Sequence, residues 1–170
     1  MTGHAAMVVV TEEQYLYFDF GRYQTQNGFG RARGANTDPK LELKTKPEWS
    51  PENRLRNIHD LCVELEELSD ATHGVGPISL SVLYAIDCNK VLNFVYLTQG
   101  EGQIVYGAIA PRKLNCARFV TKAILAGHPP KKMRRLLRYP VLGSTTPLYN
   151  VVVCGEGNNT LNFKPENYLT

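Results

Sequence analysis

Residues that favour β-strands dominate the first part of the chain. Residues 5–11 (AAMVVVT) and 15–22 (YLYFDFGR) are two runs rich in β-branched and aromatic side chains, with a short polar turn between them. This pattern predicts a β-hairpin. The next stretch, residues 24–38, is rich in Gly and Asn and indicates a loop, with one short strand over residues 29–33.

Farther along the chain, apolar residues recur at intervals of three and four. Within residues 53–68 these positions are Leu55, Ile58, Leu61, Cys62, Leu65 and Leu68. This spacing predicts an amphipathic helix over residues 53–68, and Ser50 followed by Pro51 is typical of a helix start. The pattern also predicts strands over residues 41–43, 78–86, 104–109 and 148–154, and helices over residues 89–97, 116–126 and 131–139.

The order of these elements favours an α+β fold. The first strands are grouped, and an adjacent pair is too close in sequence for a crossover helix, so we expect a mainly antiparallel sheet packed against helices. A chain of 170 residues fits one domain, residues 1–170, in which we expect residues 155–170 to form a polar tail.

Composition and charge exclude several classes of function. The chain is 43% apolar and 21% charged, as globular domains are, and its net charge of +3 is too small to indicate a nucleic-acid partner. No apolar run predicts an integral membrane segment, and no signal peptide is visible, so we expect a cytoplasmic protein. A periplasmic or envelope-associated form stays open if the N-terminus has been trimmed, and the oligomeric state stays open as well.

Four cysteines, Cys62, Cys88, Cys116 and Cys154, are scattered without a C-x-x-C pair or zinc-finger spacing, so we expect reduced thiols, no metal site and no cofactor. Cys116 opens a predicted helix directly after Asn115, whose side chain is suited to cap it. The N–H groups and dipole of a helix N-terminus stabilise a thiolate. Cys116 is therefore either a small core residue or a nucleophile, with Cys88 as its rival on position alone.

The predicted hairpin supplies a candidate base for Cys116. His4 stands at the edge of the first strand, and if Ala6 pairs with Asp19, then His4 and Asp19 share one face of the hairpin. Asp19 is then placed to hold the His4 imidazole in one tautomer. A register shifted by one residue would put Asp19 on the opposite face, so the prediction is sharp. An exposed His4 and an Asp19 in an unrelated salt bridge are the alternatives.

Three arginines, Arg22, Arg31 and Arg33, flank the expected cleft, and with Asn115 they form the expected substrate-binding set. Arginine forks bind carboxylates or phosphates, although these side chains are equally suited to pair with acids such as Asp38. The pattern of residues 131–139 predicts a basic helix. It favours a helix on the protein surface that packs through its Met and Leu side chains over one that contacts an anionic membrane.

The segments GHAAMVVV, YLYFDFGRY and LNCARFV resemble, in their order and spacing, the circularly permuted papain-like enzymes. These include permuted relatives of the NlpC-type peptidases, the YiiX-like group and the lecithin–retinol acyltransferase family. The acyltransferase signature N-C-E-H-F-V is similar to residues 115–120 (NCARFV), which lack its Glu-His pair. The run FDFGRY with GFGRAR is also similar to an uncharacterised bacterial domain family.

This resemblance implies a papain-like fold with the nucleophile at a helix N-terminus. It implies roles for Cys116 as nucleophile, His4 as base and Asp19 as the orienting residue, at a position where the superfamily often has a second His. We therefore expect a cysteine hydrolase that cleaves an amide bond, peptide or isopeptide-like, through a thioester. An acyltransferase or thioesterase of the lecithin–retinol type, acting on an acyl substrate, and a non-catalytic binding module are the alternatives.

Overall fold

The computed structural model describes residues 3–72, 76–110, 112–140, 144–155 and 160–163 of the chain. Its main sheet has the strand order β1-β2-β3-β5, and every pair is antiparallel. The strands are β1 (Ala6–Val10), β2 (Tyr15–Gly21), β3 (Phe29–Gly34) and the short β5 (Ile104–Val105). The predicted hairpin is confirmed, and so is its register, because Ala6 pairs with Asp19.

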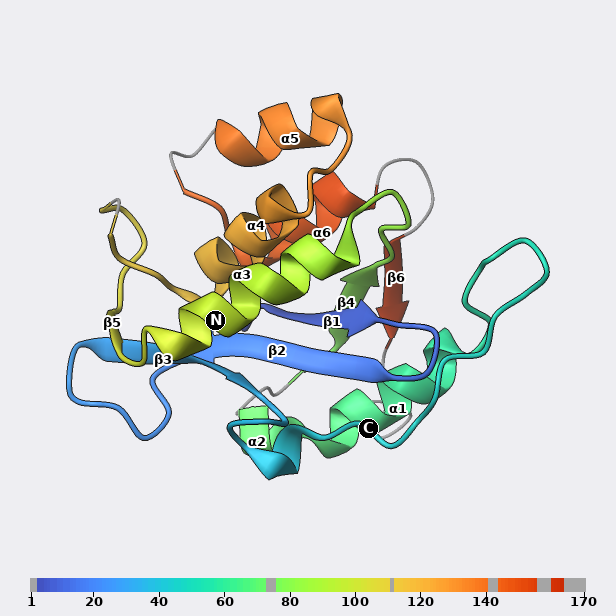
Figure 1. Ribbon diagram of the computed structural model, residues 1–170, viewed down its shortest axis with the longest axis horizontal. Coiled ribbons are helices and arrows are strands. Elements are labelled where there is room, and N and C mark those ends of the chain that lie inside the picture. Colours follow the sequence, from blue (N-terminus) through green and yellow to red (C-terminus); the bar gives the residue numbers. More distant parts are fainter. Residues whose placement is uncertain (1–2, 73–75, 111, 141–143, 156–159, 164–170) are drawn as a thin grey trace.

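Helices cover both faces of this sheet (Figure 1). On one face lie α3 (Cys88–Gly100) and α4 (Cys116–Ala126), with α5 (Lys131–Arg138) and α6 (Pro147–Cys154) packed outside them. On the other face lie α1 (Ile58–Glu67) and the short α2 (Ser69–Thr72). The prediction of an α+β fold, with a mainly antiparallel sheet packed against helices, is confirmed.

The alternation of side chains along β2 builds two separate cores. Phe18 and Phe20 point toward α3 and α4 and join a cluster that includes Phe119. Tyr15 and Tyr17 point the other way and join a second cluster with η1 (Pro39–Leu41) and α1. Because successive side chains of a strand alternate between faces, Asp19 belongs to the face of Tyr15 and Tyr17.

Two helices, α3 and α4, begin directly after a residue whose side chain caps the helix. The Asp87 side chain accepts a hydrogen bond from the backbone N–H of Lys90 at the start of α3. The Asn115 side chain accepts one from the N–H of Arg118 at 2.9 Å, so α4 begins at Cys116 as predicted. Cys116 therefore has its place in the fold because of the residue that precedes it.

The strand predicted over residues 148–154 is wrong, because this segment forms α6. Pro147 occupies the first turn, and the Thr146 hydroxyl accepts a hydrogen bond from the N–H of Tyr149, which is a helix N-cap. Asn150, Val153 and Cys154 are buried at helical spacing against α4 and α5. The run of valines favoured a strand, and the cap together with tertiary packing outweighed it.

Other predicted boundaries also needed correction. The strand predicted over residues 78–86 is only β4 (Ile78–Ser81), and it lies outside the main sheet, paired with β6 (Thr160–Phe163). β6 lies within the stretch expected to be a polar tail. The strand over 104–109 ends at Val105, and residues 41–43 form no strand, since the 3₁₀ turn η1 ends at Leu41.

The helix predicted over residues 53–68 begins only at Ile58. The Ser50 hydroxyl accepts hydrogen bonds from the N–H groups of Glu52 and Arg54, and Asn53 has a positive φ of 55°. These contacts close a tight turn at the position where the sequence suggested a helix cap. Among the described residues, none of the helices has both the length and the apolar character needed to cross a bilayer.

Candidate active site

The structure brings His4, Asp19 and Cys116 together. His4 Nε2 lies 3.1 Å from Asp19 Oδ2, and the His4 ring is close enough to the Cys116 thiol for each group to shift the pKa of the other. Asp19 belongs to the sheet face that α1 and α2 cover, whereas Cys116 begins α4 on the opposite face. His4 lies just before β1, the edge strand, so it reaches a partner on each face of the sheet.

Asp19 is completely buried and is surrounded by donors. Arg33, its cross-strand neighbour on β3, forms a bidentate pair with it at 2.9 and 2.6 Å, and the Tyr17 hydroxyl donates to it at 3.1 Å. Burial opposes ionisation of the carboxyl, but the hydrogen bonds from His4 and Arg33 outweigh it and lower the pKa of Asp19. Asp19 therefore stays a carboxylate inside the protein.

His4 is held in the charged form by its two neighbours. Burial by itself would lower its pKa, but the hydrogen bond to Asp19, the proximity of Cys116 and the negative charges of both groups raise the pKa to about 9. Its side chain keeps 23% of its surface exposed. The imidazole is thus oriented by a buried carboxylate while part of the ring remains accessible.

Cys116 differs from the other three cysteines in its electrostatic environment. Burial opposes the thiolate, but the neighbouring His4 ring and the nearby backbone N–H groups of Ala5 and Ala117 lower the pKa of Cys116 below 9.0. Burial raises the pKa of Cys62 and of Cys154 to about 11. The pKa of the rival, Cys88, is also raised, by burial and by the charge of Asp87.

Tyr106 is a residue of this site that the sequence argument missed. Its side chain lies beside Cys116, and burial together with the charge of Cys116 raises the pKa of the phenol. A bridge between Tyr106 and Leu114 places the two segments side by side. No motif marks Tyr106, because its approach to Cys116 depends on the loop that folds back between them.

Two of the expected substrate-binding residues have partners within the protein. Arg33 is 4% exposed, holds Asp19 and lies over the Tyr23 ring, with its Cζ 3.3 Å from the ring centroid. Arg31 pairs with Asp38 through bonds of 2.8 and 2.6 Å. The sequence left open whether Arg31 binds a substrate or pairs with Asp38. In the structure, Arg31 pairs with Asp38.

Arg22 has a different position from the other two arginines. Its side chain is exposed, and its guanidinium lies over the ring of Tyr106 at 4.6 Å from the centroid. Because the Tyr106 side chain also lies beside Cys116, Arg22 is one aromatic ring away from the thiol. Asn115 uses its side chain to cap α4.

A buried neutral network supports the first turn of α4. Asn150 of α6 donates to the carbonyl of Ala117 at 2.8 Å. The Thr121 hydroxyl lies 2.9 Å from the Ala117 carbonyl, the Thr145 hydroxyl and the Asn150 side-chain oxygen. The residue after Cys116 is therefore fixed from a part of the chain more than twenty residues away. In the described ranges, no three His, Cys, Asp or Glu side chains gather in a way that could hold a metal ion.

Comparison with known proteins identifies a family. The family model described as "Type VI secretion system effector TseH-like" matches residues 1–133, so the chain belongs to the TseH-like family. The matched range contains His4, Asp19, Tyr106 and Cys116, and it ends before α6. No curated protein and no solved structure matches the chain significantly.

Proposed function

We propose that this TseH-like protein is a papain-like cysteine hydrolase that cleaves an amide bond through a thioester. One observation carries the proposal: a single imidazole, His4, is hydrogen bonded to a buried carboxylate and lies beside a thiol whose pKa it lowers. A nucleophile, a base and a group that orients the base are the minimum set for this chemistry. The four-stranded sheet packed against helices is consistent with the expected papain-like fold.

In the proposed reaction, the Cys116 proton resides on His4 and the thiolate attacks the carbonyl carbon of the amide. As the S–C bond forms, the carbonyl π electrons move to oxygen. We assign the backbone N–H of Cys116 and the hydroxyl of Tyr106 as donors for this oxyanion, because Tyr106 lies beside Cys116. The raised pKa of Tyr106 keeps that hydroxyl protonated.

The tetrahedral intermediate then collapses and the C–N bond breaks. The His4 imidazolium gives its proton to the leaving amine, and an acyl group remains on Cys116 as a thioester. His4, now neutral, takes a proton from water, whose oxygen attacks the thioester carbon. The S–C bond breaks, the carboxylic acid leaves, and Cys116 is regenerated. Asp19 keeps the imidazole in the orientation that both proton transfers need.

Arg22 is the arginine that we retain as a substrate contact. It is exposed, and its guanidinium covers the ring of Tyr106. An anionic group of the substrate close to the scissile amide would lie within reach of this guanidinium. We expect Arg22→Gln to raise KM for a substrate with a carboxylate beside that amide, and to leave kcat nearly unchanged.

Thiol labelling tests the catalytic assignment without a known substrate. Iodoacetamide, followed by mass spectrometry, is expected to modify Cys116 before Cys88 near neutral pH, and His4→Ala is expected to slow that modification. Cys88→Ser is the matched control and should label like the wild type. Equal labelling of Cys116 and Cys88, or labelling of Cys116 that does not depend on His4, would favour the non-catalytic binding module.

Hydrolysis is tested on bacterial cell-wall peptides in water enriched in oxygen-18. Incorporation of the heavy isotope into a new carboxylate, abolished by Cys116→Ala, supports a hydrolase. Appearance of the acyl group on an added amine or alcohol, without the isotope, would instead indicate an acyltransferase.

The family description extends the proposal to biology. We propose that the protein acts as an effector delivered by a type VI secretion system, with the hydrolase as its toxic activity. A secreting strain that carries Cys116→Ala should deliver the protein at the normal level and lose its advantage over susceptible neighbours. Normal killing by that variant would refute the link between this site and toxicity.

A further inference from the structure

Charge is divided unevenly along the chain. Residues 102–155 contain nine Lys or Arg residues and no Asp or Glu, whereas residues 57–89 contain six Asp or Glu residues and no Lys or Arg. The net charge of +3 for the whole chain conceals this division.

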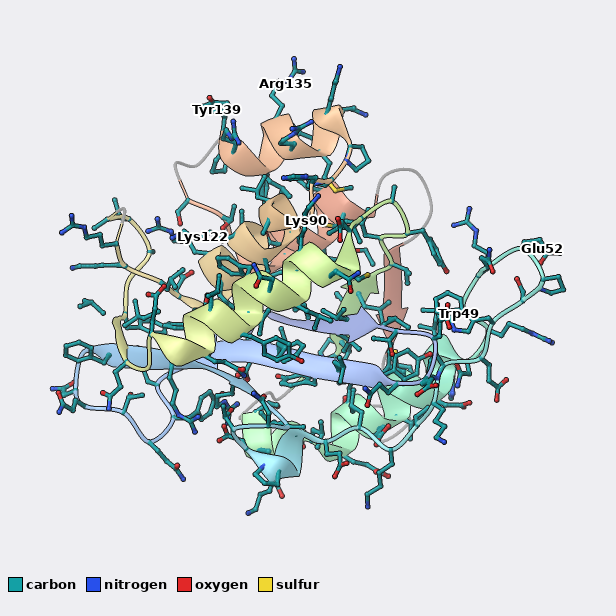
Figure 2. All side chains as sticks on the ribbon, in the orientation of Figure 1. Trp49, Glu52, Lys90, Lys122, Arg135 and Tyr139 are labelled. Atoms are coloured by element: carbon teal, nitrogen blue, oxygen red, sulfur yellow. The ribbon has the colours of Figure 1, made fainter. Side chains whose placement is uncertain are left out.

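The fold places most of the acidic group on the opposite side of the main sheet from α5. Five of its six acids belong to α1 and α2, whereas Asp87 caps α3 on the other face. The acidic segment includes α1 and α2, which lie beneath the sheet, and the basic segment includes α5, the outermost helix on the other side (Figure 1). Figure 2 shows Arg135 and Tyr139 directed away from the body of the molecule. The exposed cations of α5 are Lys131, Lys132, Arg135 and Arg138.

α5 presents charge and keeps its apolar side chains inside. Met133 and Leu137 are 3% and 2% exposed and pack with Val153 and Cys154. The helix therefore has no apolar stripe left to insert into another molecule. Directly after it, Tyr139 is 72% exposed, with an apolar ring and a polar hydroxyl.

Three exposed cations of α5, Lys131, Arg135 and Arg138, take part in none of the salt bridges found in the described part of the chain. Those salt bridges engage Arg31, Arg33, Lys90 and two histidines. A single exposed ion pair with another protein contributes little. A surface with many closely spaced anions attracts these three cations together.

We propose that α5 and Tyr139 form a docking surface for an anionic lipid bilayer. The cations lie on a protruding helix, which suits a flat array of phosphates better than a single nucleic-acid strand, for which proteins use a basic groove. The Tyr139 ring suits the boundary between head groups and acyl chains. Repulsion turns α1 and α2 away from the bilayer, so the contact also orients the molecule. The surface contains none of the residues proposed for catalysis, so the docking proposal does not depend on the proposed hydrolase activity.

Vesicle co-sedimentation tests the proposal with two lipid mixtures. The protein is expected to bind vesicles of phosphatidylcholine with phosphatidylglycerol, to ignore phosphatidylcholine alone, and to dissociate as salt is raised. The variant Lys131→Glu/Arg135→Glu/Arg138→Glu should lose affinity by about a hundredfold or more. The matched control, Lys40→Glu/Lys44→Glu/Lys46→Glu, changes the net charge equally at exposed positions away from α5 and should retain binding.

Further arms make each outcome decisive. Circular dichroism checks that the α5 variant folds, and if it does not, the neutral variant Lys131→Gln/Arg135→Gln/Arg138→Gln must show the loss of binding instead. Inorganic phosphate at the concentration of the lipid head groups should not displace the protein. Equal loss in the α5 variant and the control, binding to phosphatidylcholine alone, displacement by phosphate, or tighter binding to double-stranded DNA than to the anionic vesicles would each overturn the proposal.

Discussion

Two buried polar networks support the candidate site, and they differ in charge. The sheet network consists of Asp19, Arg33, Tyr17 and His4, and it orients the proposed base. The helix network consists of Asn150, Thr121 and Thr145 on the carbonyl of Ala117, and it fixes the turn that bears the proposed nucleophile. Both are buried, but only the first contains ions.

The two networks differ in how strongly each buried group depends on its hydrogen-bond partner. In the sheet network each ion is stable in the interior only because its partner is present, so removal of one leaves an uncompensated charge. In the helix network, removal of one group leaves an unpaired dipole, which costs less. The sheet network must therefore respond strongly to mutation and to pH, and the helix network weakly to mutation and hardly at all to pH.

The largest expected effect follows from Asp19→Asn. This change leaves Arg33 buried without a counter-charge, and we expect the free energy of unfolding to fall by about 3–5 kcal/mol. Urea denaturation measures it, with Asp38→Asn as the control for an Asp–Arg pair at the surface. A loss below about 1 kcal/mol would show that the two networks do not differ as described.

The second effect concerns pH and His4. Its pKa is raised from 6.5 to about 9 on folding, so its stabilising contribution is complete below pH 6.5 and is lost as pH rises through about 9. The difference in unfolding free energy between wild type and His4→Ala should therefore shrink across that window. Asp19, whose pKa is lowered, acts at the acid end, where its contribution is lost as pH falls.

Chemical denaturation of both proteins from below pH 6.5 to above pH 9 measures this difference. A difference that stays constant across the window would refute the raised pKa of His4. Hydrolysis, which needs the imidazolium as an acid, should decline near pH 9, whereas alkylation of the Cys116 thiolate should not.

A smaller effect is expected from Asn150→Leu in the helix network. The Ala117 carbonyl and the Thr121 hydroxyl each lose a hydrogen-bond partner. We expect the free energy of unfolding to fall by about 1–3 kcal/mol, by an amount that does not change with pH. Asn93→Leu, at an exposed position of α3, is the control. A loss that varied with pH like that of His4→Ala would mean that the two networks act as one.

The smallest effect is expected from Arg31→Gln. Arg31 and Asp38 also make a bidentate contact, as Arg33 and Asp19 do, but each of their side chains is 18% exposed. Solvent screens this pair, and a double-mutant cycle with Asp38→Asn should give a coupling energy of less than about 1 kcal/mol. A coupling as large as the effect of Asp19→Asn would show that burial is not what separates the two pairs.

The parts of the fold that could be predicted depend on local rules. Alternation and a short turn set the register that pairs Ala6 with Asp19, and the Asn115 cap sets the start of α4. The predicted strand over residues 148–154 failed because its valines satisfy a helix as well as a strand once Thr146 caps the segment. Local propensity was ambiguous there, and packing against α4 and α5 decided the outcome.

The candidate site divides in the same way. The hairpin predicted the contact of His4 with Asp19, because it depends on pairing between neighbours in sequence. The roles of Arg33 and Tyr106 were not predictable, because one depends on which of three arginines falls opposite Asp19 and the other on a loop that returns to α4. An arginine near a cleft has the same sequence signal whether it binds a substrate or a buried carboxylate.

By itself, the sequence determined the hairpin register, the capped start of the Cys116 helix and the division of charge into an acidic and a basic segment. These features follow from periodicity, capping and composition, which act over short distances along the chain. Only the tertiary structure decided that His4 contacts partners on both faces of the sheet, that Arg33 is buried on Asp19, and that α5 faces away from α1. Those relations join residues from fourteen to more than a hundred positions apart, and they depend on how the cores pack, which no local pattern encodes.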